Sequence, residues 1–402
     1  MTTILLIFSA LLLRLVLSPY GSLPIDMADW IGWSNRLVEI PFKNFYDAWS
    51  DYLPGYLYVL WFLGHIKNFF YGIGLTIPLE IIYKLHAILA DLTLVFVAYK
   101  ISKKFFDQKI ALVIAAIFAF NPAIFANSSL WGQIDVLNTL FYILTFILLI
   151  RKRILLSGVI LAISLLIKPQ GVFLLPFVLL IVIKDKWRIF EFIKGVFVSL
   201  LLFVGAFISF SNKLNILQFI FERYSVSLNQ YQYTSVNAFN FWAIGQRWWR
   251  PDSQIWLGIP LQYWGMAIFS VISGLILWNF WKKYKTGTIG EKLFILNFSL
   301  ALIFLGSFIF LTRVHERLLL TPLIFLMLAA IFKKDLWIFV GILSITYVAN
   351  LYFSFVWITD NFSYVFNEGM INIICTINIS VFVILLVILL KERFHFDDSK
   401  TA

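Results

Sequence analysis

Four carboxylates in this chain are placed where they could do chemistry. Asp26 and Asp29 are spaced i and i+3, which puts them on one face of a helix. Asp51 precedes a Pro-Gly turn signal, and Asp135 closes the polar stretch 131–135 (WGQID). A carboxylate can act as a general base or bind a divalent metal. Asp26 and Asp135 could equally stabilise a helix start, and both interpretations stay open.

A compact basic turn follows much later in the chain. Residues 312–317 read Thr-Arg-Val-His-Glu-Arg, so Arg313, His315, Glu316 and Arg317 fall within five positions. The planar guanidinium suits phosphate because it gives bidentate contacts. Anchoring to lipid head groups would explain the arginines but not the His-Glu pair. The turn is therefore predicted to bind a phosphate.

Isolated cations within apolar runs form a second set of candidates. Lys168 lies between two short apolar segments, and Lys84 lies within a longer one. Ionisable residues at such places indicate functional sites. The alternatives are snorkelling of Lys168 to head groups and a buried pair of Lys84 with Asp91, two helical turns further on. Arg14 interrupts the first apolar run in the same way.

The composition requires these groups to be carried by a membrane protein. The 402 residues are 61% hydrophobic and only 13% charged, whereas soluble domains average about 25% charged residues. This excludes a soluble enzyme, a disordered protein and a conventional DNA-binding domain. The net charge of +11 is explained by topology before any anionic partner. One cysteine, Cys375, and four histidines give neither a disulfide framework nor a His-rich metal cluster.

The apolar runs predict an all-α polytopic protein of about 12 transmembrane helices (11–13), since a span needs about 20 apolar residues. The predicted spans are 3–19, 78–100, 109–126, 135–150, 154–168, 171–184, 190–210, 259–281, 293–311, 318–332, 336–357 and 370–390. The first is expected to be retained and not cleaved as a signal peptide.

Charge placement gives the orientation. The loops at 100–109, 151–153, 184–194, 282–292, 333–334 and 391–400 hold about 20 of the 32 Lys and Arg residues and are predicted to be cytoplasmic. The apolar segment 53–71 must then begin and end outside, so it is predicted not to span. We expect one integral-membrane domain over 1–402, with long outer loops at 20–77 and 211–258. An amphipathic helix over 27–41 is expected in the first loop, with Trp30, Trp33 and Leu37 on one face.

The order of these motifs resembles the GT-C superfamily of polyprenyl-phosphate-sugar-dependent glycosyltransferases, and most closely the bacterial relatives of the second GPI-anchor mannosyltransferase. The residues that carry the resemblance are Asp26, 51–58 (DYLPGYLY), Asn121-Pro122, 131–135 (WGQID), Lys168-Pro169-Gln170 and His315-Glu316-Arg317. Members often have Pro where this chain has Leu53. The resemblance implies a first outer loop with juxtamembrane helices, as the charge pattern does.

The resemblance implies an inverting transfer of a hexose, with mannose the expected sugar, from a polyprenyl-phosphate donor to an extracytoplasmic glycan, lipid or protein acceptor. Asp26, seven residues before Trp33, matches the general base, and Asp135 matches the second acidic position. Some members hold a divalent metal (Mg or Mn), for which Asp26 and Asp135 would be the ligands. The residues expected to bind the donor phosphate are Arg313, His315, Glu316 and Arg317, and after them Lys168 and Lys84. The residues expected to position substrate are Asp29, Asp51, Tyr52, Trp131, Gln133 and Gln170.

A transporter or flippase of lipid-linked sugars is the alternative, because it too would place charges in a cavity among spans. Transporters typically carry internal repeats with a site near the bilayer midplane. Here no repeat is visible, and the polar residues gather toward the predicted outer face. The protein is therefore expected in the plasma (inner) membrane as a multi-pass enzyme with an extracytoplasmic site, its partners being the donor, the acceptor and membrane lipid, and not nucleic acid.

Overall fold

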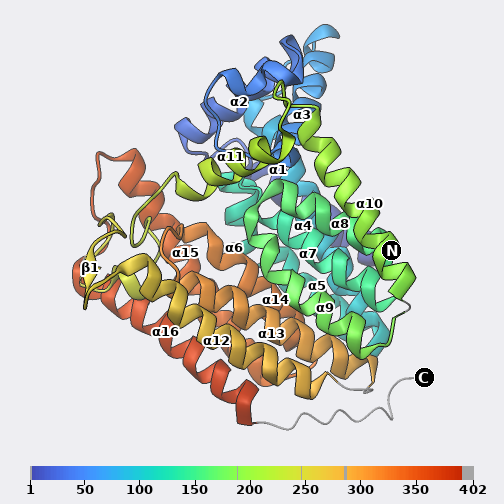
Figure 1. Ribbon diagram of the computed structural model, residues 1–402, viewed down its shortest axis with the longest axis vertical. Coiled ribbons are helices and arrows are strands. Elements are labelled where there is room, and N and C mark those ends of the chain that lie inside the picture. Colours follow the sequence, from blue (N-terminus) through green and yellow to red (C-terminus); the bar gives the residue numbers. More distant parts are fainter. Residues whose placement is uncertain (1, 188, 246, 285–287, 392–402) are drawn as a thin grey trace. The chain divides into compact units, whose positions relative to one another are not determined.

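The computed structural model describes residues 2–187, 189–245, 247–284 and 288–391, and these are almost entirely helical (Figure 1). Parts of three predicted basic loops, at 188, 285–287 and 392–400, lie outside the described residues, as does position 246 of the second outer loop. The chain folds into two units, and each unit packs mainly within itself. Unit 1 holds residues 1–10, 92–127 and 231–402, and unit 2 holds residues 11–91 and 128–230.

The helices are α1 (Thr2–Leu17), α2 (Pro24–Glu39), α3 (Pro54–Gly72), α4 (Leu79–Phe105), α5 (Gln108–Phe120), α6 (Pro122–Phe125), α7 (Asp135–Ile150), α8 (Ile154–Ile167), α9 (Leu175–Lys184), α10 (Ile189–Ile208), α11 (Ile216–Asn229), α12 (Leu261–Lys283), α13 (Ile289–Phe310), α14 (Leu320–Ala330), α15 (Trp337–Thr359) and α16 (Glu368–Lys391). Two strands, β1 (Ile255–Trp256) and β2 (Ile259–Pro260), pair antiparallel.

Seven helical stretches are long and apolar enough to cross a membrane: Leu79–Phe105, Gln108–Trp131, Ile189–Ile208, Leu261–Lys283, Ile289–Phe310, Lys334–Thr359 and Glu368–Lys391. Four shorter apolar helices have 10–17 residues: Thr2–Leu17, Asp135–Ile150, Ile154–Ile167 and Pro169–Lys184. The all-α polytopic class is confirmed. Each of the twelve predicted spans coincides with a helix, while the number that cross the membrane stays a prediction.

The first outer loop, in unit 2, holds a helix pair. The predicted amphipathic helix is present as α2, which begins at Pro24, where a missing N–H costs no hydrogen bond. Trp30 and Trp33 lie on its buried face and pack in the core shared with α3. Ser34 Oγ donates to the Leu60 carbonyl at 2.9 Å, which ties the two helices together.

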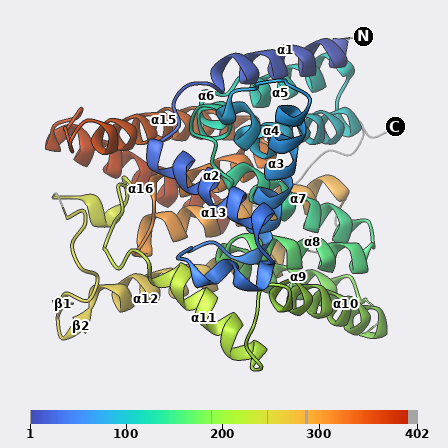
Figure 2. The same ribbon diagram turned by 90° about the horizontal axis from the view of Figure 1, so that it is seen from above.

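Within unit 2, α8 contacts α3, α7 and α10 (Figure 1). In unit 1, α12, α13 and α16 contact one another, and α14 packs against α13 and α15. The α13 span is the most enclosed of the seven, with 83% of its apolar window buried. The β1–β2 hairpin leads directly into α12 (Figure 2).

The topology prediction concerns α3, which is not among the seven long apolar stretches. We expect Asn68→Cys, at an exposed position of α3, to react with a membrane-impermeant maleimide in intact cells, because α3 is predicted to lie wholly outside. The measurement needs a Cys375→Ser background to remove the native thiol. Lys103→Cys, exposed at the end of α4, is the matched control and should react only after permeabilisation. The reverse pattern would invert the assigned orientation.

Candidate active site

Asp26 lies in the first turn of α2, and two donors from the loop before α7 hold its carboxylate. Trp131 Nε1 donates to Oδ2 at 2.9 Å, and Gln133 Nε2 donates to the same oxygen at 2.8 Å. The α2 N-cap is Leu23, without a side-chain cap bond, so Asp26 does not cap this helix. Half-exposed Asp26 thus presents its other oxygen, Oδ1, to which no described residue donates a hydrogen bond.

The loop that delivers Trp131 and Gln133 turns sharply at Gly132. Residues 126–131 form a π-helical turn, and Gly132 follows with φ of 87°, a conformation that L side chains rarely adopt. A Cβ at this position would lie 2.7 Å from Lys84 Cγ. Both the backbone angle and the space therefore require glycine between the two donors to Asp26.

Lys84, on α4, ties this loop to the segment before α2. Its side chain is fully buried, and Nζ donates to the carbonyl oxygens of Ser18 at 2.5 Å, Tyr20 at 2.9 Å and Leu130 at 2.7 Å. These bonds use all three ammonium protons. The phosphate-binding role predicted for Lys84 stays a prediction, and it would require one of these bonds to break.

Asp91 pairs with Arg14, so the alternative of a Lys84–Asp91 pair is wrong. Arg14 donates from Nε to Asp91 Oδ2 at 2.7 Å and from Nη2 to Oδ1 at 2.8 Å, and both side chains are fully buried. Ser128 Oγ adds a bond to Oδ2 at 2.7 Å. This bidentate pair fixes α1 against α4 and holds the start of the Trp131 loop.

Asp135, the first residue of α7, faces Lys168 at the end of α8. Lys168 Nζ lies 2.6 Å from Asp135 Oδ1, and the Asp135 side chain is only 3% exposed. The packing of α7 on α8 brings the two residues together across 33 positions. Two predicted site residues therefore form one ion pair, and Lys168 does not snorkel away from it.

Tyr56, on α3, is fully buried in the core that α3 shares with α2. Burial raises the pKa of its hydroxyl well above the usual value, and the charges of neighbouring Tyr52, Asp26 and Asp135 act in the same direction. The Tyr52 and Tyr56 rings are 4.7 Å apart.

Gln170, Asp51 and Asp29, three further residues predicted to position substrate, also belong to unit 2. The Gln170 side-chain oxygen is buried in the 3-10 turn after Lys168, and Asp51 is half-exposed before α3. Burial, and after it the charge of Asp26, raises the pKa of Asp29 above its usual value. The choice of Asp26 over Asp29 as general base rests on the bonds from Trp131 and Gln133 to Asp26 and stays a prediction.

The 312–317 turn belongs to unit 1. Arg313 adopts φ of 63° and donates from Nε to Asp252 Oδ2 at 2.7 Å and from Nη2 to Gln262 Oε1 at 2.8 Å. Thr312 Oγ1 also bonds Asp252 at 3.1 Å. The Arg313 guanidinium thus has a buried counter-charge, because Asp252 is only 1% exposed.

His315 and Arg317 continue the same turn. The His315 backbone bridges to Val236 and Asn237, and its ring lies 4.7 Å from the Tyr231 ring. Arg317 is 21% exposed, with Nη1 3.9 Å from the carboxylate of buried Glu316. Arg317 is partly exposed, and its predicted role in binding an external phosphate stays a prediction.

Sequence reasoning missed Tyr56 and Asp252 as parts of these clusters. Tyr56 stands in the motif 51–58, and its place two residues after Pro54 could have indicated a side chain directed from the start of a helix. Asp252 follows Pro251 in an aromatic loop, and no spacing rule connects it to Arg313, 61 positions later. Only the fold identifies such a pair.

The fold and these clusters define a polytopic all-α membrane protein with carboxylates and cations gathered at the ends of its helices. Residues 72–214 match the family described as dolichyl-phosphate-mannose-protein mannosyltransferase, a family of the GT-C superfamily. The match covers part of the chain and supports its resemblance to the GT-C glycosyltransferases. It includes Trp131, Gln133, Asp135 and Lys168 but neither Asp26 nor the 312–317 turn. No curated protein matches the chain.

Proposed function

We propose that the protein is an inverting glycosyltransferase that moves a hexose from a polyprenyl-phosphate sugar to an extracytoplasmic acceptor at the plasma membrane. Mannose is the proposed hexose. The observation that carries the proposal is the Asp26 carboxylate, fixed through Oδ2 by Trp131 and Gln133. Under this proposal Oδ1 is the oxygen that accepts the proton of the incoming hydroxyl. A base held in this way contributes about 10²–10⁴-fold in rate.

The reaction follows from these groups. Asp26 takes the proton of the acceptor hydroxyl as that oxygen attacks C1 of the sugar from the face opposite the phosphate. The new C1–O bond forms while the bond from C1 to the phosphate oxygen breaks, so the configuration inverts. The electron pair leaves with the polyprenyl phosphate. A cationic group must stabilise that charge. Separately, the 312–317 turn of unit 1, with Arg317 and His315, is proposed to bind a phosphate.

A divalent metal does not fit the acids described above. Asp135 already has the Lys168 ammonium at 2.6 Å, and Asp26 binds two neutral donors. In the part of the chain that the structure describes, no group of three or more His, Cys, Asp or Glu residues could hold a metal ion. The mechanism therefore takes no step through a metal. The Asp135–Lys168 pair is proposed to position the acceptor.

The test of the function is a transfer assay with purified protein. Polyprenyl-phosphate mannose, glucose and arabinose would each be offered with membrane extract, and labelled sugar would be followed into product. We expect one of the hexose donors to be used. A protein that moves labelled donor across proteoliposome membranes without transferring sugar would be a transporter, and the transferase proposal would then fail.

Arg317→Ala should weaken donor binding by about tenfold or more, because hydrogen bonds to charged groups are worth about 1.5–3 kcal/mol. Arg317→Lys should recover little of the loss, since an ammonium cannot make the bidentate contact. Equilibrium binding of labelled donor measures both. Arg151→Ala, an exposed arginine after α7, is the matched control and should bind normally. Unchanged donor affinity in Arg317→Ala would remove this residue from the phosphate site.

A further inference from the structure

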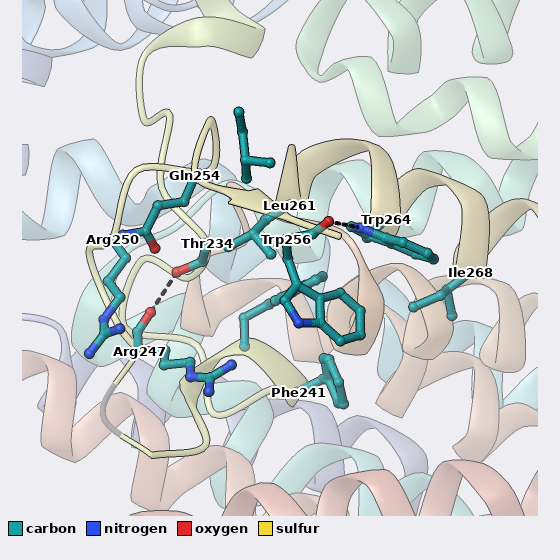
Figure 3. Close-up of a pocket in the computed structure, with 11 residues that line it drawn as sticks. Thr234, Phe241, Arg247, Arg250, Gln254, Trp256, Leu261, Trp264 and Ile268 are labelled. Atoms are coloured by element: carbon teal, nitrogen blue, oxygen red, sulfur yellow. Dashed lines mark hydrogen bonds between the residues drawn. The ribbon is translucent and has the colours of Figure 1, made fainter. Parts of the chain in front are cut away.

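Unit 1 contains a cavity of about 490 Å³ that the transfer mechanism does not use. Its walls come from residues 234–256, in the second outer loop, and from the first turns of α12 (Figure 3). The lining residues are Thr234, Phe241, Trp242, Arg247, Arg250, Gln254, Ile255, Trp256, Leu261, Trp264 and Ile268. The set has two arginines and no acid. The volume lies within the range of small-molecule sites.

Backbone hydrogen bonds place the two arginines along one wall. Thr234 Oγ1 donates to the Arg247 carbonyl at 2.5 Å, and Thr234 N donates to the Arg250 carbonyl at 2.8 Å. No carboxylate of the described residues forms a salt bridge with either guanidinium. Figure 3 shows the Arg247 guanidinium on the same side of the cavity as the Phe241 ring and the Trp256 indole. The cavity is therefore lined by two guanidinium groups and by aromatic rings.

The β1–β2 hairpin and α12 form the apolar part of the cavity. Trp264 Nε1 donates to the Trp256 carbonyl at 2.9 Å, which holds the hairpin on the first turn of α12. The hairpin turns at Leu257 and Gly258, both with positive φ, and Leu257 is 73% exposed. The helix α12 is long and apolar enough to span a membrane, and the ends of such a helix are expected where head groups and acyl chains meet.

We propose that this cavity binds the phosphate head group of a membrane amphiphile. The phosphate accepts bidentate bonds from Arg247 and Arg250, and the apolar chain runs along Leu261 and Ile268 at the start of α12. Arginine forks suit phosphate oxygens, and the tryptophans suit the interface. A bilayer phospholipid and a polyprenyl phosphate share this chemistry. The site does not depend on the transfer reaction.

The experiment measures ligand binding to the full-length protein in mixed micelles, without any sugar transfer. The probes are phosphatidylglycerol, polyprenyl phosphate, uncharged polyprenol and inorganic phosphate. The variant is Arg247→Gln with Arg250→Gln. Its matched control is Lys103→Gln with Lys104→Gln, which removes two exposed charges at the C-terminal end of α4. Polyprenyl phosphate is measured on an Arg317→Ala background, so that the proposed donor site contributes little.

We expect the Arg247/Arg250 variant to lose about tenfold or more in affinity for at least one phosphate amphiphile, while the lysine control keeps it. Loss for phosphatidylglycerol identifies a bilayer lipid, and loss for polyprenyl phosphate alone identifies a carrier lipid. Equal loss in both charge variants, unchanged binding, or saturation by inorganic phosphate alone would overturn the proposal. If the glutamine variant unfolds, the Arg247→Lys/Arg250→Lys variant is measured in its place. We expect its affinity for the phosphate amphiphile to be reduced, and full affinity would contradict the proposed site.

Discussion

Asp26→Asn should lower turnover by about 10²-fold or more while leaving donor binding nearly intact. The amide oxygen of asparagine can still accept the bonds from Trp131 and Gln133, so the loop before α7 should keep its place. What the variant loses is the ability to take a proton. Steady-state kinetics with the donor identified by the transfer assay, together with equilibrium donor binding, separate these two effects.

Asp29→Asn is the matched control, three residues along the same helix, and should cost much less turnover. It also has a pH signature. Because the pKa of Asp29 is raised in the folded state, ionising this group costs stability as pH rises through the shifted pKa. The variant should be at least as stable as the parent at neutral pH and lose that advantage below the ordinary pKa of 3.8. Retained turnover in Asp26→Asn with loss in Asp29→Asn or Asp135→Asn would contradict the base assignment.

Asp91→Asn should lower the free energy of unfolding by about 3–5 kcal/mol, because it leaves the buried Arg14 guanidinium without a counter-charge. Both partners are fully buried, so solvent cannot compensate. Ser128 would also lose a charged acceptor. Thermal unfolding in detergent, followed by tryptophan fluorescence, measures the change.

The double variant Arg14→Met/Asp91→Leu is the control for that prediction. Replacing a buried ion pair by apolar residues of similar size is often neutral or stabilising. We expect it to recover most of the lost stability. A double variant as unstable as Asp91→Asn would show that the pair also sets the geometry of the adjoining helices, and an unchanged Asp91→Asn would mean that Arg14 is not desolvated.

The sequence predicted the helices well because apolar runs and their flanking charges are local signals. It also selected Asp26, Trp131 and Gln133 separately, and the fold brings them into one hydrogen-bonded cluster. The partners of the buried cations were harder to predict from the sequence. Lys84 and Asp91 share a helix face, yet in the folded chain Asp91 pairs with Arg14, 77 positions away. Lys84 instead donates to backbone carbonyls.

The same limit applies to the basic turn. Its residues suggested an anion site, but the sequence does not reveal that Asp252 is folded against Arg313. Long-range pairing depends on how helices and loops pack, which the spacing of residues along the chain does not record.

The Lys84 ammonium binds only backbone oxygens, and every amino acid supplies one of these. The bonds to Lys84 therefore put no demand on the side chains at positions 18, 20 and 130, while in natural sequences of this fold position 84 should keep lysine and position 132 glycine. Asp26 is held differently, by the side chains of Trp131 and Gln133, so those three positions should change together or not at all. One loop thus carries two kinds of evolutionary constraint, side by side.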